Sequence, residues 1–271
     1  RGPPGCLSLL EVACLALLPF TVFCTTCLFF ATVYHWAPAL VVALLLLMFF
    51  VSLVENRRGA TDRDYPLRFY MSTQCLAALC LSTVTGLMAY NAFLAQYWSF
   101  RDSHAYGNVL PSEPAAGYAD AGKIVFADEA RIDALHATGY KDGHTYCVAP
   151  ILDSSRVDSV QFWAAGVDCC GSRSSFTCDD AFDPAARSGL AVRKRDWHPQ
   201  FALAVQQAEA AYGLTSSPDA LFVRWVVDPE TVQLNFWRVG SGILLAACGI
   251  DFVASCLVAW VVHLALKSRG S

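Results

Sequence analysis

Long apolar runs separated by short polar breaks fill the first hundred residues, and a fourth apolar run follows a large polar block. The runs cover residues 7–35, 39–54 and 69–98, and the fourth lies within 236–271. An α-helix needs about 20 apolar residues to cross a bilayer, with a range of about 17 to 25. The pattern therefore predicts an all-α, four-helix transmembrane bundle whose second helix is the shortest. Residues 99–235 are predicted to form an extramembrane domain between helices three and four.

The composition agrees with an integral, multi-pass membrane protein. Hydrophobic residues make up 55% of the chain and charged residues 15%, whereas an average soluble domain has about 25% charged residues. We therefore divide the chain into three parts. Residues 1–98 hold transmembrane helices one to three, 99–235 form the large domain, and 236–271 hold helix four and a tail.

Basic residues predict the direction in which the helices cross. The stretch between the second and third runs holds Arg57, Arg58 and Arg63, and Lys267 follows the fourth run. Because loops rich in Lys and Arg stay on the cytoplasmic or stromal side, we expect residues 99–235 on the extracellular or lumenal side. That block holds 18 acidic and 11 basic residues, a net charge of −7, so nucleic acid is not expected as a partner.

Four of the twelve cysteines lie in residues 99–235, namely Cys147, Cys169, Cys170 and Cys178. An even, clustered set on an oxidising face of a membrane predicts a disulfide framework. The neighbours Cys169 and Cys170 are not expected to bond each other. Two pairings remain open: Cys147–Cys169 with Cys170–Cys178, or Cys147–Cys170 with Cys169–Cys178.

Strands are predicted in the first half of the large domain. Residues 123–126, 145–149 and 160–165 are short runs rich in β-branched and aromatic residues, which is the composition of strands. Pro150 is expected to end the second of them, and residues 103–122 are expected to form a loop.

Helices are predicted in the second half of the large domain. Apolar residues recur at helical spacing over 201–212, and Gly213 then provides a helix-ending signal. A second helix is expected from Ser216 or Ser217 to about Asp228, because Pro218 would fall in its first turn. The large domain is therefore predicted to be an α+β domain cross-linked by disulfides.

The overall plan resembles a known family. Four spans, a short connection between the first two, a large domain before the last, and the triplet Cys169-Cys170-Gly171 together resemble the tetraspanins. The resemblance covers the layout of the whole chain and three residues of motif. It implies a non-enzymatic organiser that gathers other integral membrane proteins laterally through its spans and large domain. The family places the partner cysteines after the triplet, whereas Cys147 precedes it here.

A second resemblance covers short stretches of the large domain. They are residues 118–122, 139–141, 145–151, 162–170 and 176–180. These stretches look like those of four-span proteins from dinoflagellate algae. The resemblance implies an accessory subunit of an algal organellar supercomplex, either a photosystem or a respiratory complex. Chlorophyll or carotenoid becomes a candidate ligand if the complex is a photosystem.

Several polar groups inside the spans are candidates for chemistry. Asp251 lies near the middle of the fourth span and Glu11 near the start of the first. Such acids face protein or water rather than lipid, so Asp251 is expected to be neutral or hydrogen-bonded, with ion transport as the alternative. Cys24 and Cys27 have the C-x-x-C spacing of a membrane thiol oxidoreductase, but buried free cysteine is also a common packing residue.

Histidines give no metal-binding pattern. His35 at a membrane boundary and His263 in the fourth span are candidate pigment ligands if the protein belongs to a photosystem. We find no P-loop, nucleophile elbow or dinucleotide fingerprint, so we expect no enzymatic activity, no catalytic residues, no metal and no required cofactor. Bound lipid is expected.

Small residues mark helix-packing surfaces in two spans. Gly242, Ala246 and Gly249 recur at four- and three-residue spacing in the fourth span, and Ser82 and Gly86 do so in the third. Such stripes let helices approach closely. We expect packing inside the bundle, with lateral association as the alternative. The sequence as a whole predicts a membrane organiser or accessory subunit that binds other membrane proteins and lipids.

Overall fold

A computed structural model describes residues 8–61, 66–154, 159–172, 175–192 and 198–269. The basic residue Arg63, used above for orientation, lies outside them. The chain divides into two compact units. The span unit comprises Arg1–Trp98 and Asn235–Ser271, and the sheet domain comprises Ser99–Leu234.

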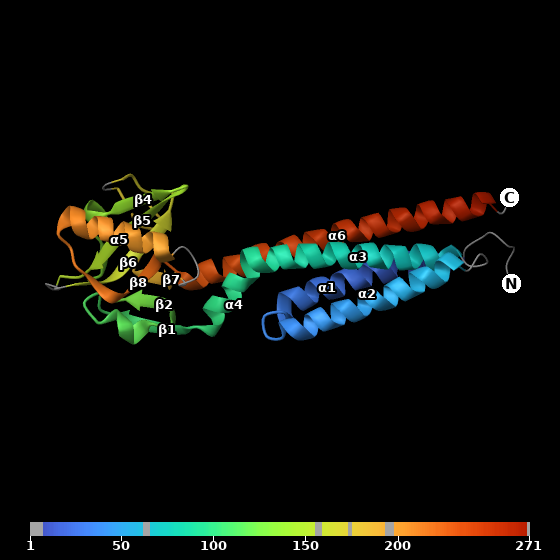
Figure 1. Ribbon diagram of the computed structural model, residues 1–271, viewed down its shortest axis with the longest axis horizontal. Helices are drawn as coiled ribbons and strands as arrows, with labels where there is room; N and C mark the ends of the chain where they lie inside the picture. Colours follow the sequence, from blue (N-terminus) through green and yellow to red (C-terminus); the bar gives the residue numbers. More distant parts are fainter. Residues whose placement is uncertain (1–7, 62–65, 155–158, 173–174, 193–197, 270–271) are drawn as a thin grey trace. The chain divides into compact units, whose positions relative to one another are not determined.

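Long apolar helices build the span unit (Figure 1). They are α1 Leu9–Leu28, continued by the π-helical turn η1 Phe29–Val33; α2 Pro38–Thr61; α3 Pro66–Ala89, continued by the π-helical turn η2 Tyr90–Leu94 and by α4 Ala95–Asp102; and α6 Pro229–Arg269. Within the described residues, four of these helical segments are long and apolar enough to cross a membrane. The prediction of four spanning helices is therefore confirmed at this level.

The second helix is longer than its apolar run. It ends at Thr61 rather than near residue 54, because the polar residues that follow still form helix-compatible contacts. Arg58 pairs with Glu55 at 2.9 Å one turn away, and the Asn56 amide donates to Thr73 Oγ1 on α3 at 2.7 Å. The Arg58–Glu55 pair stabilises this polar turn of the helix locally, and the Asn56 bond ties it to α3.

The sheet domain contains eight strands among its described residues (Figure 1). They are β1 His104–Val109, β2 Ala121–Phe126, β3 Arg131–Ile132, β4 Thr138–Asp142, β5 His144–Leu152, β6 Val160–Val167, β7 Ser188–Ala191 and β8 Ser216–Val226. The strand order is β1-β2-β7-β8-β6-β5-β3, with β4 also paired to β5. Two pairs, β1 with β2 and β6 with β8, are parallel, and the others are antiparallel. Short 3-10 helices, η3 Ala115–Tyr118 and η4 Ala134–His136, and the helix α5 His198–Tyr212 complete the domain.

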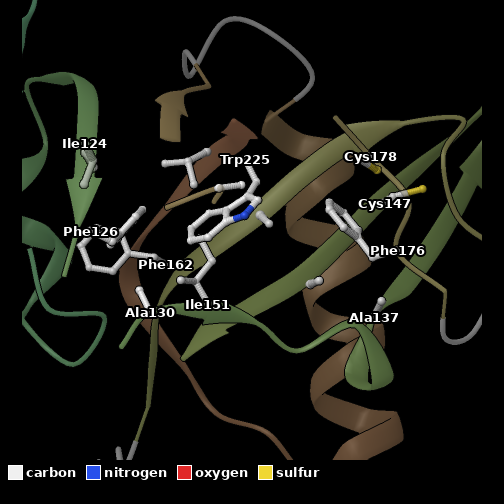
Figure 2. Packing of buried hydrophobic residues seen from close by; sticks show 14 of the residues in the cluster. Ile124, Phe126, Ala130, Ala137, Cys147, Ile151, Phe162, Phe176, Cys178 and Trp225 are labelled. Atoms are coloured by element: carbon white, nitrogen blue, oxygen red, sulfur yellow. The ribbon is translucent and has the colours of Figure 1, made fainter. Parts of the chain in front are cut away.

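Both faces of the central strands are buried because alternate side chains serve two cores. Along β5, Cys147 and Ile151 enter one core while Tyr146 and Val148 enter the other. The helix α5 covers the second face (Figure 1). There the Phe201 ring of α5 packs against the Tyr146 ring. On the first face Phe126 packs against Phe162 and Trp225, and Phe176 and the sulfurs of Cys147 and Cys178 share the same core (Figure 2).

Most predicted elements of the domain are found, but one has the wrong type. Residues 216–226 form the strand β8 between β7 and β6, not a helix. A strand buried on both faces shows an almost continuous apolar run, here Leu221 to Val226, and such a run also satisfies helical spacing. The β-branched and aromatic content of this run favours a strand. The helix predicted over 201–212 is confirmed as α5, and Gly213 ends it with φ of +69°.

Two further predictions are corrected. The stretch 103–122, expected to be a loop, contains β1 and η3. The strand β5 continues past Pro150 to Leu152. Pro150 is tolerated there because it falls between the part of β5 that pairs with β4 and the part that pairs with β3. Its carbonyl accepts a bond from the Asp133 N–H at 2.9 Å.

Candidate functional site

The two disulfides of the sheet domain meet at the adjacent residues Cys169 and Cys170. Cys147 on β5 is bonded to Cys170, and Cys169 is bonded to Cys178, with Cα–Cα distances of 5.8 and 5.0 Å. This is one of the two pairings that the sequence left open. Cys147 and Cys178 lie in the core of the first sheet face. Removing either bond would therefore disturb packing as well as the covalent framework.

Glycines make room for the sulfurs. A Cβ on Gly166 of β6 would lie 2.7 Å from Cys169 Sγ, and one on Gly139 of β4 would lie 2.8 Å from Cys170 Sγ. Gly166 is the partner of Cys147 in the β5–β6 register. The disulfide region therefore depends on strand register as well as on cysteine spacing.

Asp168 holds the backbone just before the cysteine pair. It has φ of 56°, its Oδ1 accepts from the Thr145 N–H at 2.8 Å, and its Oδ2 lies 2.6 Å from His144 Nδ1. The Thr145 N–H first, and then His144, lower the pKa of the Asp168 carboxyl below its ordinary value. Sequence reasoning did not identify this aspartate, because its partners lie more than twenty residues away.

Two further carboxylates, Asp179 and Asp180, attach the segment after Cys178 to the end of β8. Asp179 accepts two bonds from Arg224, at 3.1 Å from Nε and 2.5 Å from an Nη. Asp180 accepts from the Val227 N–H at 2.8 Å. The Asp179 carboxylate raises the pKa of the Arg224 guanidinium. These contacts, also missed from the sequence, tie the chain on both sides of the cysteines to neighbouring strands.

A metal site is not supported at the disulfides. Among the described residues, the group of side chains close enough to share an ion is Cys147, Cys169 and Cys178. All three sulfurs are in disulfides, and thiolate is the form of cysteine that binds metal.

A hollow of about 470 Å³ lies on the sheet domain, with Phe100, Leu221 and Phe222 among its apolar lining and Asp120 and Asp219 among its polar lining. The Asp120 carboxylate already accepts a hydrogen bond from the Tyr106 hydroxyl at 2.9 Å, and its other oxygen lies 2.9 Å from His104 Nδ1. The Asp120 bond raises the pKa of Tyr106. The described lining does not pair a nucleophile with a base, so it gives no basis for a catalytic assignment.

The two acids predicted inside the spans have different surroundings. Glu11 forms a capping box with Ser8, whose N–H and hydroxyl donate to Glu11 Oε2 at 2.7 and 2.9 Å. Its role is therefore to begin α1. Asp251 is half-buried on α6, and its Oδ2 is a buried atom without a hydrogen-bond partner in the described part of the chain.

Three thiols come together in the span unit. Cys27 on α1 belongs to a buried cluster against which Cys248 of α6 packs, and Cys24 lies one turn before Cys27. All three are free thiols, and Cys27 is only 3% exposed. Cys248 was not singled out from the sequence, because it lies more than two hundred residues from the C-x-x-C pair.

The candidate pigment ligands are placed differently from each other. His35 Nδ1 lies 3.1 Å from the Tyr90 hydroxyl, and its ring stacks on Trp98 with centroids 5.6 Å apart. His35 is thus part of an aromatic cluster with Trp36, Tyr97 and Trp237. His263 is half-buried on α6, and its Nδ1 has no hydrogen-bond partner among the described residues.

The two small-residue stripes have opposite environments. On α3, Ser82 and Gly86 are buried, and a Cβ on Gly86 would collide with the Phe30 ring of α1. On α6, Gly242, Ala246 and Gly249 are all exposed. A Cβ on either glycine of the α6 stripe would meet no atom within 4 Å. The described structure therefore places the α3 stripe inside the bundle and leaves the α6 stripe exposed.

Comparisons with known proteins add no relative. No family model, no curated protein and no solved structure matches the chain. The resemblances to the tetraspanins and to the dinoflagellate proteins remain predictions.

Proposed function

We propose that this protein is a non-enzymatic membrane organiser or accessory subunit, which binds a helix of another integral membrane protein along α6. The single observation that carries the proposal is the exposed stripe of Gly242, Ala246 and Gly249. Small residues at three- and four-residue spacing form close interfaces between transmembrane helices.

The contrast between the two stripes supports an intermolecular role. The chain uses the stripe on α3 to bring α1 close, whereas the stripe on α6 faces away from the buried side of its own helix. That buried side includes Leu244, Ala259 and Val262. At about 100° per residue, these positions lie on the other side of α6 from Gly242 and Gly249. The bundle therefore occupies one face of α6 and leaves the stripe free.

The flanks of the stripe are suited to cover a partner helix. Leu245 and Ile250 lie beside it and are each 72% exposed. Long apolar side chains beside small ones let a second helix approach at the centre and be covered at the edges. A tetraspanin-like organiser and an accessory subunit of an algal organellar supercomplex both belong to this class of function.

The positions of the basic residues at the helix ends support the membrane orientation that was predicted from the sequence. Arg57, Arg58, Arg68 and Lys267 belong to the ends of α2, α3 and α6 remote from the sheet domain in the chain. We propose that this end is cytoplasmic or stromal, and that the sheet domain is extracellular or lumenal, where its disulfides would persist.

A photo-crosslinker at position 246 tests the proposal. In native membranes it should yield a crosslinked species that is absent when the crosslinker replaces Ala254, an exposed residue on another flank of α6. Gly242→Leu with Gly249→Leu should lower the yield about ten-fold, because the partner backbone can no longer approach. Ala254→Leu is the size-matched control. Equal crosslinking from 246 and 254, or an unchanged yield in the double variant, would refute the proposal.

One observation favours a second candidate, a membrane thiol oxidoreductase. The packing of Cys248 against the cluster that contains Cys27 brings a third thiol near the C-x-x-C pair. A mixed disulfide trapped between one of these residues and a thiol partner would support this function. Retention of every measured activity by the Cys24→Ala/Cys27→Ala variant would argue for packing instead.

A further inference from the structure

A groove opens between the first turns of α1 and α3, at the end of the bundle where both helices begin. Its volume is about 620 Å³, and its walls are formed by Leu10, Leu18, Leu67 and Met71, together with Cys14. Glu11 and Arg68 complete the lining. The groove is therefore apolar, carries two charged side chains, and lies near the N-terminal ends of two spanning helices.

The two charges are not equivalent. The Glu11 carboxylate is engaged by Ser8 in the capping box. Arg68 is exposed, and its guanidinium forms no ion pair with any residue that the structure describes. Among the described residues, Arg68 is therefore a cation of the groove without an ionic partner, whereas the Glu11 carboxylate keeps its charge and already accepts two hydrogen bonds from Ser8.

The described charges around the groove favour an anion. Arg57 and Lys267 are exposed and belong to the same end of the span unit, whereas Glu55 is paired with Arg58. Anionic lipids bind basic pockets between transmembrane helices on the cytoplasmic side. A guanidinium suits a phosphate because two of its N–H groups can bond two oxygens at once.

We propose that the groove binds one phospholipid with an anionic head group. An acyl chain lies along Leu10, Leu18 and Met71, and the phosphate is held by Arg68. The site is separate from the α6 stripe and does not depend on a partner protein. Its occupant is a membrane lipid rather than a free phosphate, because the walls are apolar over the length of two helical turns of α1.

Cys14 provides a direct measurement of occupancy. It lines the groove and is exposed, while Cys80 and Cys256 are exposed free thiols outside it. The full-length protein in neutral detergent would be treated with a permeant maleimide, and the alkylation rate of each cysteine would be followed by peptide mass spectrometry. Phosphatidylglycerol at ten times its dissociation constant should slow Cys14 about ten-fold. Cys80 and Cys256 should change much less.

Matched lipids and variants distinguish the alternatives. Phosphatidylcholine with the same acyl chains, and glycerol 3-phosphate without chains, should each protect Cys14 weakly. Arg68→Gln should weaken protection by phosphatidylglycerol about five-fold, as expected for one cation at an anionic lipid. Arg57→Gln, outside the groove at the same end, should leave it nearly unchanged.

Several outcomes would overturn the proposal. Equal protection by phosphatidylcholine would show that the charge has no role. Equal effects of Arg68→Gln and Arg57→Gln would indicate a diffuse basic surface instead of a site. Slow alkylation of Cys14 without lipid, at a rate that lipid does not change, would show that the chain before Ser8 or another protein segment covers the groove.

Discussion

The sheet domain and the span unit use apolar residues in opposite ways. In the sheet domain Phe162 and Trp163 are 0% exposed and enter two different cores. In the span unit many of the largest apolar side chains face outward, as with Leu257 on α6 at 60% exposed. The difference shows that apolar composition identifies which residues avoid water, but not whether protein or lipid replaces it.

The sources of stability differ accordingly. The sheet domain has a protein core on each face of its central strands, two disulfides and charge-assisted bonds around them. The span unit has three smaller buried clusters along its helices, and its helices satisfy their own backbone groups as a bilayer requires. We therefore expect truncation of a buried side chain to lower the stability of the sheet domain strongly. Truncation of a side chain on the outer face of a span should lower the stability of the span unit only slightly.

The largest effect should come from matched phenylalanine truncations. Phe162→Ala should destabilise the sheet domain by about 3–5 kcal/mol, because it removes a fully buried ring and leaves a cavity. Phe50→Ala on α2, where the ring is 58% exposed, should change the stability of the span unit by less than about 0.5 kcal/mol. Urea titrations followed by proteolysis of the domain, and by helical circular dichroism in detergent, measure the two effects. Similar losses for both variants would contradict the comparison.

The disulfides should give the next largest effect. Cys147→Ser/Cys170→Ser should lower the free energy of unfolding of the sheet domain by about 3 kcal/mol, the estimate for a closed loop of this length. The control is Cys24→Ser/Cys27→Ser, which removes two free thiols of the span unit and should leave the domain unchanged. Mass mapping of the wild type should find Cys147 linked to Cys170 and Cys169 linked to Cys178. Peptides that link Cys147 to Cys169 would show that the assigned pairing is wrong.

The smallest effect should be the acid dependence caused by Asp168. Its folded-state pKa is lowered by Thr145 and His144, so its charged form stabilises the domain at pH values above the ordinary aspartate pKa of about 4. That contribution disappears as the pH falls through the lowered folded value. The stability difference between wild type and Asp168→Asn should therefore shrink between pH 5 and pH 2. Asp142→Asn, on the exposed end of β4, is the control, and a difference that stays constant with pH would exclude this role for Asp168.

The sequence predicted the parts of the fold that depend on local composition. Spanning helices follow from the length of apolar runs, and the strands around residues 123–126 and 160–165 follow from short β-branched and aromatic runs. The strand β8 was mistaken for a helix, because burial on both faces removes the alternation that marks a half-buried strand. Pro218, a helix-start signal in the sequence, lies inside this strand.

The candidate sites were predictable only where their residues lie close in sequence. The cysteine cluster was found, but choosing between its two pairings requires the β5–β6 register. The Arg224–Asp179 pair, and the packing of Cys248 against the cluster of Cys27, join positions that the chain separates widely. The outward direction of the α6 stripe was also out of reach, because spacing defines a helix face without showing what lies opposite.

Gly166 has a consequence for how this domain reaches its oxidised form. It lies opposite Cys147 in the register of β5 and β6, and its missing side chain leaves the space that Cys169 and Cys178 occupy. A slip of one residue between these strands would bring Ala165 or Val167 opposite Cys147, and it would turn each side chain to the other face. The sulfurs would then no longer fit. The native register of β5 and β6 is therefore the one that accommodates both disulfides, and closing them stabilises the chains in which these two strands are aligned in this way.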